Sequence, residues 1–245
     1  MATTFKTITA NDVTNTRTLL HEAIPLTGTI ASGTYADENI KTFSHGMFES
    51  VYDYPYLSSS ANQIFDITYG YSANSSKSSS AANQNAKKIN VYNQMAQVLV
   101  GYDSAGRIQD FDQDGNIAAG GTKTQEAFFV NFSRLLSKDE IKKDSFRFTV
   151  VTGGMPSVFS ASGSLDSRFT IGDFGASTSY LVNSPAGEYG LLRSGSASGV
   201  VVGHIYYQAG VAVISSSIFG GNLNAGGVAT PAADNGATFL GPIGI

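Results

Sequence analysis

Three aspartates at alternating positions form the motif whose spacing most suggests ligand chemistry. Asp110, Asp112 and Asp114 stand just before Gly115, and carboxylates spaced in this way can direct their oxygens towards Ca²⁺. The twelfth position of a calcium loop of this type would fall on Gly121, where a bidentate Glu is required. The motif therefore leaves two alternatives, a weak calcium site and a plain Asp-Gly hairpin turn.

The other ionisable residues give little support for catalysis. The three histidines, His21, His45 and His204, are far apart in the sequence, and we expect His204 to face outward from a strand or to pair across it. The nearest segment to a nucleophile elbow has Ala197 where the nucleophile should stand. Trp, a common sugar-stacking residue, is absent, which disfavours a glycosidase. We therefore predict a protein that is not an enzyme, with no catalytic residues, no cofactor and no assured metal site.

Two apolar runs near the C-terminal end predict a β-hairpin. Residues 200–207 and 211–219 are rich in Val, Ile and Tyr, and they flank a short loop, Gln208-Ala209-Gly210. Gly210 supplies the positive φ that a three-residue hairpin loop with a bulge requires.

Further strands and one helix follow from the hydrophobic periodicity. Apolar residues alternate over 64–71, over 128–132 and over 146–150, which is typical of strands. A stripe with helical spacing predicts a helix over about 88–100, ended by Gly101, and consists of Val91, Met95, Val98, Leu99 and Tyr102.

Together these patterns predict a mainly β fold, an antiparallel β-sandwich-like body with one central α-helix and extended terminal arms. We divide the chain into an N-terminal arm and first strand (1–30), a single β-rich body (31–219) and a Gly/Ala-rich C-terminal arm (220–245). Within the body, residues 72–82 form a Ser-rich loop that could become ordered against a neighbour.

Composition limits the classes of partner. Only 14% of the residues are charged and the net charge is −4, so the basic surface that nucleic acids need is not expected. No stretch of the sequence is apolar enough to span a membrane. With no Cys, the fold must depend on packing and hydrogen bonds. A surface of such low charge density favours assembly with other protein subunits over a free monomer.

Clustered aromatic residues are the candidates for such an interface. Phe43 and Phe48 precede a run of three tyrosines, and Tyr side chains combine a large apolar face with a polar tip. The interface candidates are Tyr52, Tyr54, Tyr56, Tyr206 and Tyr207.

Three segments of the chain carry a resemblance to a known group of proteins. Residues 203–214 (GHIYYQAGVAVI), residues 128–148 (beginning FFVNFSRLLSKDEIKK) and the opening as far as about residue 30 resemble virion structural proteins of contractile-tailed, T4-like phages, marine cyanophages among them. The resemblance implies a position in the tail, baseplate or neck more than in the shell. It implies no particular contact residue.

We therefore expect a non-enzymatic structural component of a tailed-phage virion. It would be assembled in the host cytoplasm, and its partners would be other virion proteins in a homo- or hetero-oligomeric ring. The alternatives are a capsid decoration protein and a tail fibre or adhesin that binds host glycan through residues 52–56. An enzyme that degrades envelope polymer is the remaining, less favoured alternative.

Overall fold

The computed structural model describes residues 40–53, 56–59, 61–79, 85–117, 120–133, 140–151 and 168–219. The predicted arms, 1–30 and 220–245, lie outside these ranges, as does the last part of the Ser-rich loop. Within the described part of that loop, Ser76–Ser79 form a short 3₁₀ helix, η3.

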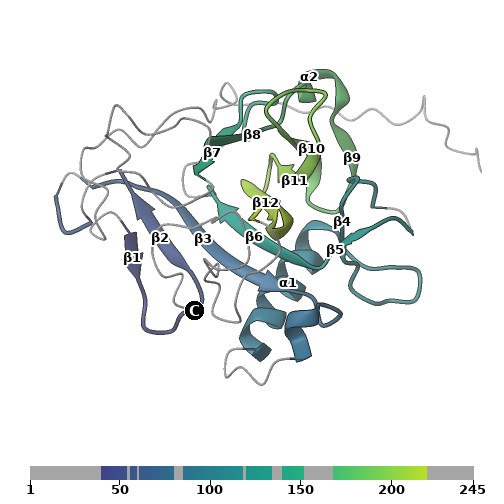
Figure 1. The fold of residues 1–245 in the computed structure, drawn as a ribbon, viewed down its shortest axis with the longest axis horizontal. Helices are drawn as coiled ribbons and strands as arrows, with labels where there is room; N and C mark the ends of the chain where they lie inside the picture. The colour runs from purple at the N-terminus through teal and green to yellow at the C-terminus, as the bar shows by residue number, and fades with distance from the viewer. Residues whose placement is uncertain are drawn as a thin grey trace, which may run out of the picture.

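A single antiparallel sheet of ten strands makes up most of the described chain (Figure 1). The strands pair in the order β1-β2-β3-β6-β12-β11-β10-β8-β7, and β9 pairs with β10. Their bounds are β1 Ile40–Thr42, β2 Glu49–Tyr52, β3 Gln63–Tyr71, β6 Glu126–Asn131, β7 Arg147–Val151, β8 Arg168–Gly172, β9 Leu181–Ser184, β10 Gly187–Ser194, β11 Val201–Tyr206 and β12 Val211–Ser215. A separate two-stranded ribbon consists of β4 (Phe111–Asp112) and β5 (Lys123–Thr124).

The predicted C-terminal hairpin is confirmed as β11 and β12, which lie at the centre of the sheet. Tyr206 pairs with Val211, and Gly210 has the expected positive φ, 67°. The loop is one residue longer than predicted, because Tyr207 leaves the strand and enters the core, where its hydroxyl donates a hydrogen bond to Asp173. A short 3₁₀ helix, η5 (Ser216–Phe219), follows β12.

Both faces of the central strands are buried. Along β6, Ala127 and Phe129 pack on one face of the sheet, while Phe128 and Val130 pack on the other. Strand alternation puts successive side chains on opposite faces, and the burial of both sets shows that each face is covered. Two separate clusters of buried hydrophobic residues result, one on each face of the same sheet.

The first cluster is enclosed because the sheet curls back on itself. Phe65 on β3 meets Phe148 on β7 with ring centroids 5.9 Å apart, although five strands lie between β3 and β7 in the pairing order. Phe132 and Phe146 make a second contact across the same space, at 5.6 Å. The prediction of a mainly antiparallel, sandwich-like β body is confirmed, and the two facing layers belong to one continuous sheet.

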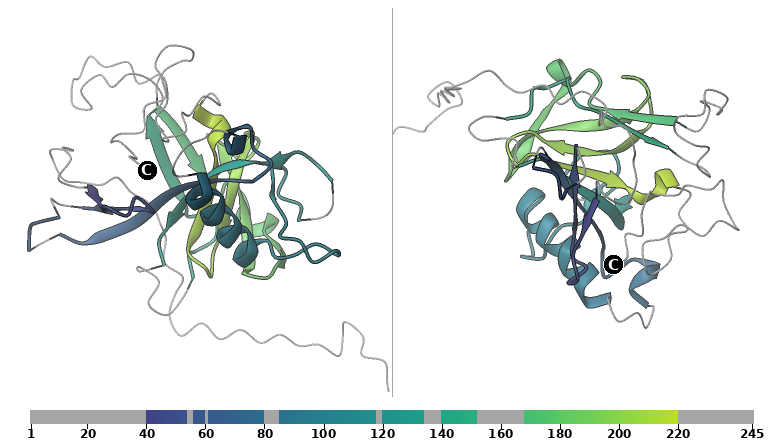
Figure 2. Two further views of the ribbon diagram at one scale, coloured as in Figure 1. Left: turned by 90° about the horizontal axis from the view of Figure 1, so that it is seen from below. Right: turned by 90° about the vertical axis from the view of Figure 1, so that its left-hand side faces the viewer.

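Helix α1, Asn85–Leu99, covers the opposite face of the sheet beside β3 (Figures 1 and 2). It begins three residues before the predicted start, and Gly101 follows its end with a φ of 89°, as expected for a helix cap. A Cβ atom on Gly70 of β3 would lie 2.8 Å from the Tyr92 backbone nitrogen. Glycine at this position therefore allows the helix backbone to approach the strand closely.

The predicted apolar stripe of the helix is only partly correct. Val91 and Leu99 are buried, but Val98 and Tyr102 are 62% and 52% exposed. The buried side of α1 consists of Lys88, Val91, Tyr92, Ala96 and Leu99. Further along the chain a single helical turn, α2 (Ala176–Ser179), packs near β10.

Candidate functional site

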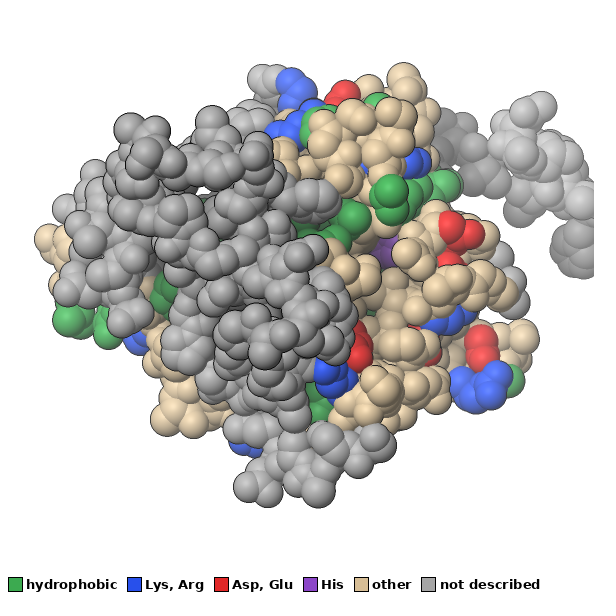
Figure 3. Space-filling model, viewed as in Figure 1, with side chains coloured by type: hydrophobic (Ala, Val, Ile, Leu, Met, Phe, Trp, Pro, Cys, Tyr) green, Lys and Arg blue, Asp and Glu red, His purple; other side chains and the backbone are tan. Residues whose placement is uncertain are grey.

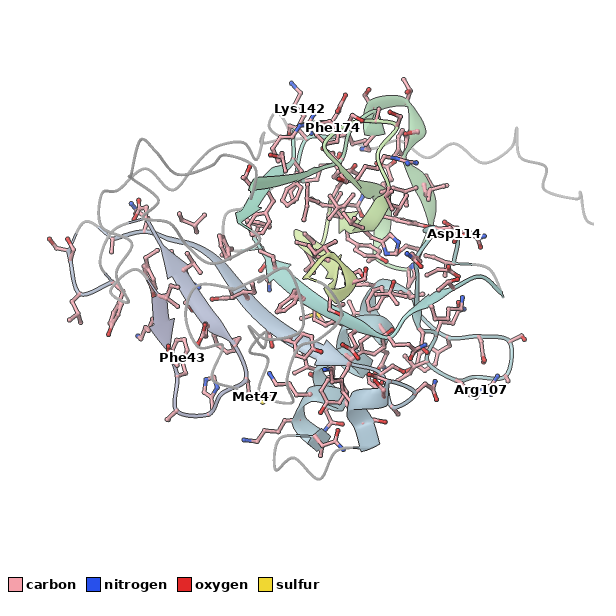
Figure 4. The ribbon with its side chains drawn as sticks, in the orientation of Figure 1. Phe43, Met47, Arg107, Asp114, Lys142 and Phe174 are labelled. Atoms are coloured by element: carbon pink, nitrogen blue, oxygen red, sulfur yellow. The ribbon has the colours of Figure 1, made fainter. Side chains whose placement is uncertain are left out.

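Each of the three aspartates of the predicted calcium motif has a hydrogen-bond or ion-pair partner within the fold. Asp110 accepts hydrogen bonds from the Ser72 hydroxyl at 3.1 Å and from Gln125 Nε2 at 3.3 Å. Asp112 forms an ion pair with Lys123 at 2.5 Å. Asp114 lies at the right-hand end of the molecule in Figure 4 and accepts a bond from the backbone N–H two residues later.

An Asp-Gly turn opens the loop that joins β4 to β5 in this segment. The Gly115 N–H donates to the Asp112 carbonyl at 3.2 Å, Gly115 has a φ of 78°, and the turn leads from β4 towards β5. Among the described residues, no three His, Asp or Glu side chains gather closely enough to hold a metal ion. The Lys123 ammonium beside Asp112 already supplies a positive charge at this position.

His204 is buried in the core, contrary to the prediction that it faces outward. Its side chain lies on the α1 face of β11, near the rings of Phe111, Tyr189 and Tyr206. Neither ring nitrogen makes a hydrogen bond of good geometry, and burial lowers the pKa of His204 to about 4. The imidazole is therefore neutral near pH 7. His45 is exposed in the β1–β2 turn, and His21 lies outside the described residues.

Asp173 is a buried acidic group whose carboxylate accepts four hydrogen bonds. One carboxylate oxygen accepts from the Phe146 N–H at 2.9 Å and from Arg147 at 3.0 Å. The other accepts from the Asp144 N–H at 2.7 Å and from the Tyr207 hydroxyl at 3.0 Å. Burial raises the pKa of Asp173, and these four donors and the Arg147 charge act in the opposite direction. The group joins the 140–147 loop to the end of β8 and to the central hairpin.

Glu126 forms a similar connection at the other end of the sheet. Its carboxylate accepts hydrogen bonds from the Tyr69 hydroxyl at 3.1 Å, from Ser75 at 2.7 Å and from Ser216 at 3.4 Å. These donors come from β3, from the Ser-rich loop and from η5, so Glu126 on β6 fixes the first part of that loop to the sheet. All of its bonds are internal to the fold.

A buried lysine and glutamate lie between α1 and the sheet. Lys88 is 1% exposed and Glu49 is 3% exposed. Lys88 Nζ makes no hydrogen bond and lies 5.9 Å from the centre of the Tyr69 ring. Burial lowers the pKa of Lys88 to about 7, whereas the nearby Glu49 charge favours its protonated form. Burial also raises the pKa of Glu49. The sequence showed no signal for this pair, because both residues appear within ordinary amphipathic segments.

The structure removes two of the five predicted interface tyrosines. Tyr206 is 1% exposed and Tyr207 is fully buried, so both belong to the core. Tyr52 and Tyr56 are half-buried, with ring centroids 6.3 Å apart. Leu57 beside them is 88% exposed, and Tyr54 lies outside the described residues.

An aromatic cluster occupies the turn between β1 and β2. The Phe43 and His45 rings stack at 5.2 Å, and the Phe48 ring lies 5.0 Å from Phe43 and 5.1 Å from His45. Lys41 Nζ lies 5.2 Å from the centre of the Phe43 ring. Sequence reasoning found Phe43 and Phe48 as interface-type residues but missed His45, because only the turn brings its ring into contact with both of them.

Comparisons of the chain with protein-family models, with curated proteins and with solved structures found no match. Within the described ranges, no helix has the length and apolar character needed to cross a membrane. The interpretation of function therefore depends on the sequence and on the geometry above.

Proposed function

We propose that this protein is a non-enzymatic structural component of a tailed-phage virion, in the tail, baseplate or neck, and that it acts by assembling with other subunits. One observation of the structure carries the non-enzymatic part of the proposal. The buried acidic groups Asp173 and Asp112 and the half-buried Glu126 each bind donors of their own fold, on different elements. Acid–base or metal chemistry requires ionisable groups that converge on one open site.

The surface of the described residues supports assembly. Large apolar side chains are exposed at several positions, which include Leu57, Val98, Tyr102 and Val182. Burial of such area contributes about 25 cal/mol per Å², from which the cost of ordering the interface is subtracted. Many copies in a closed ring act together, so modest affinity at each contact is sufficient. The resemblance of three segments to virion proteins of contractile-tailed phages supports the same role.

A second candidate function is favoured by the Tyr52–Leu57 loop. Two half-exposed tyrosine rings beside an exposed leucine are a suitable surface for a sugar ring, as in a tail fibre or adhesin that binds host glycan. Glycan-array binding that is lost in Tyr52→Ala and Tyr56→Ala would favour this function over assembly.

The proposal is tested by quantitative mass spectrometry of phage particles purified through a density gradient. The expected result is a fixed copy number per particle that survives a salt wash and matches a ring. Particles that lack the protein would contradict the proposed role, as would turnover of purified host envelope polymer by the isolated protein.

A further inference from the structure

The two ends of the described molecule differ in charge. In Figure 4, Phe43 lies at the lower left of the molecule and Met47 nearer its middle, whereas Arg107 and Asp114 lie on the right-hand side. Residues 41–48 contain Lys41 and no Asp or Glu, and Lys87 joins them through a 3.4 Å hydrogen bond from its Nζ to the His45 carbonyl. We call this surface the aromatic hairpin: Lys41, Phe43, His45, Phe48 and Lys87.

The opposite end carries the reverse charge. Residues 102–116 contain Asp103, Asp110, Asp112 and Asp114 against a single Arg107, which forms an ion pair with Asp103 at 3.0 Å. Asp112 is buried and paired with Lys123, whereas Asp114 is exposed and a backbone hydrogen bond lowers its pKa, so it stays ionised. Tyr102 adds an exposed aromatic ring at this end. We call this surface the acidic end: Tyr102, Asp103, Asp110 and Asp114. Figure 3 shows acidic side chains at the right of this face, with basic ones among them.

From this complementarity we infer that the aromatic hairpin of one copy docks onto the acidic end of a second copy of the same chain. The inference deepens the proposed assembly function and depends on it. Each surface combines aromatic rings with a net charge, which is positive on the aromatic hairpin and negative on the acidic end. Complementary charge at the rim of an interface determines orientation and association rate, while buried aromatic rings supply most of the affinity.

The positions of the two surfaces determine the kind of assembly that results. Because the surfaces differ and lie at opposite ends of the molecule, the contact is heterologous and joins copies head to tail. Such a contact closes into a ring when the rotation between neighbours permits, and otherwise extends as a filament. A two-fold dimer, which buries the same patch on both copies, is not expected from this contact.

Two charge reversals test the contact in the full-length chain. Lys41→Glu changes the aromatic hairpin, and Asp114→Lys changes the acidic end. Sedimentation velocity over a range of protein concentrations measures association at about 0.05 M and about 0.5 M salt, because screening at the higher salt weakens rim charges. We expect wild-type oligomers at low salt, fewer at high salt, and a roughly tenfold weaker association of either variant alone.

Mixing the two variants provides the sharper measurement. A copy that carries Lys41→Glu retains a normal acidic end, and a copy that carries Asp114→Lys retains a normal hairpin. In an equimolar mixture the two unchanged surfaces can pair, and the reversed hairpin of one variant meets the reversed acidic end of the other with complementary charge. Association should therefore return, with the two variants alternating along the oligomer. Phe43→Ala, which removes a central ring and leaves the charges, should weaken association more than either charge reversal. Mixed with Asp114→Lys, it should form only the pair that joins the two unchanged surfaces and no larger oligomer.

Lys142→Glu is the matched control, since Lys142 is exposed and lies away from both ends in Figure 4. It should associate as the wild type does, and circular dichroism should show the same fold for all variants. Wild-type oligomers that respond to neither reversal would overturn this contact and leave the proposed virion role standing. A wild-type chain that stays monomeric at every concentration would overturn it as well. Absence from phage particles would instead contradict the role itself.

Discussion

Replacing Lys88 by methionine should stabilise the protein. Lys88 is 1% exposed between α1 and the sheet, and its Nζ makes no hydrogen bond. A charged ammonium in this position loses its hydration and receives only partial compensation from Glu49 and from the face of the Tyr69 ring. Methionine has a similar length and flexibility, no charge, and fills the same space.

The pKa of Lys88 sets the upper limit of the stabilisation expected from Lys88→Met. Its pKa in the folded protein is about 7, against 10.5 for the ordinary side chain. At about 1.4 kcal/mol per pH unit, that interval corresponds to about 5 kcal/mol of unfolding free energy. Replacing a buried ion pair by apolar groups typically raises the unfolding free energy by about 1 to 4 kcal/mol, and we expect Lys88→Met to raise it within this range near pH 7.

The pH dependence of stability has a definite sign. Between pH 7 and 10.5 the unfolded chain keeps the proton on Lys88 that the folded chain has released, so the stability of the wild type rises with pH across this window. Urea unfolding at pH steps from about 6 to about 10 measures this rise. In Lys88→Met the rise should be absent, and in Lys87→Met, a change of the adjacent exposed lysine, it should remain.

Glu49 provides a second control. Removal of Lys88 leaves the Glu49 carboxyl buried without its positive neighbour, and this reduces the gain. The double variant with Glu49→Gln should therefore be at least as stable as Lys88→Met alone. If the wild type and Lys88→Met show the same change of stability between pH 7 and 10, the reasoning about the buried ammonium is wrong.

Three further predictions concern the core. Asp173→Asn should lower the unfolding free energy by about 2 to 4 kcal/mol, because an amide cannot accept from all four donors and lacks the charge that Arg147 faces. A loss below about 0.5 kcal/mol in urea unfolding would contradict this prediction. Gly70→Ala should lower the unfolding free energy by about 1 to 3 kcal/mol, because the added Cβ would lie 2.8 Å from a backbone nitrogen of α1. An unchanged melting temperature would refute the close approach of helix and strand. The pKa of His204 is about 4 in the folded protein and 6.5 for the ordinary side chain. The unfolding free energy should therefore fall by up to about 3 kcal/mol as the pH decreases from 6.5 to 4, and His204→Phe should remove that fall. An equal loss of stability in wild type and variant over this pH range would contradict the prediction.

The parts of the fold that could be predicted are those determined by local pattern. The β11–β12 hairpin follows from two apolar runs and the positive φ of Gly210, and α1 follows from its helical spacing and from Gly101. What covers each face of a strand is determined by contacts distant in sequence. Tyr206 and Tyr207 were predicted at an interface because alternation alone does not reveal that α1 covers one face and the curled sheet the other.

The same limit applies to the candidate sites. The spacing of Asp110, Asp112 and Asp114 left a cation site and a turn as alternatives. The structure shows the turn at Gly115, and Lys123 from the partner strand β5 pairs with Asp112. His204 has a polar side chain in an alternating strand, which suggests exposure, yet the β4–β5 ribbon and Tyr189 cover it. Such coverage depends on tertiary packing that no local pattern encodes.

A reconstruction of the intact phage particle tests the central claim most directly. The account predicts density for the curled ten-stranded sheet at a tail, baseplate or neck position, repeated around the axis, with the β1–β2 turn of each copy facing a neighbouring subunit. Particles in which no such density occurs, together with an isolated protein that remains monomeric, would contradict it.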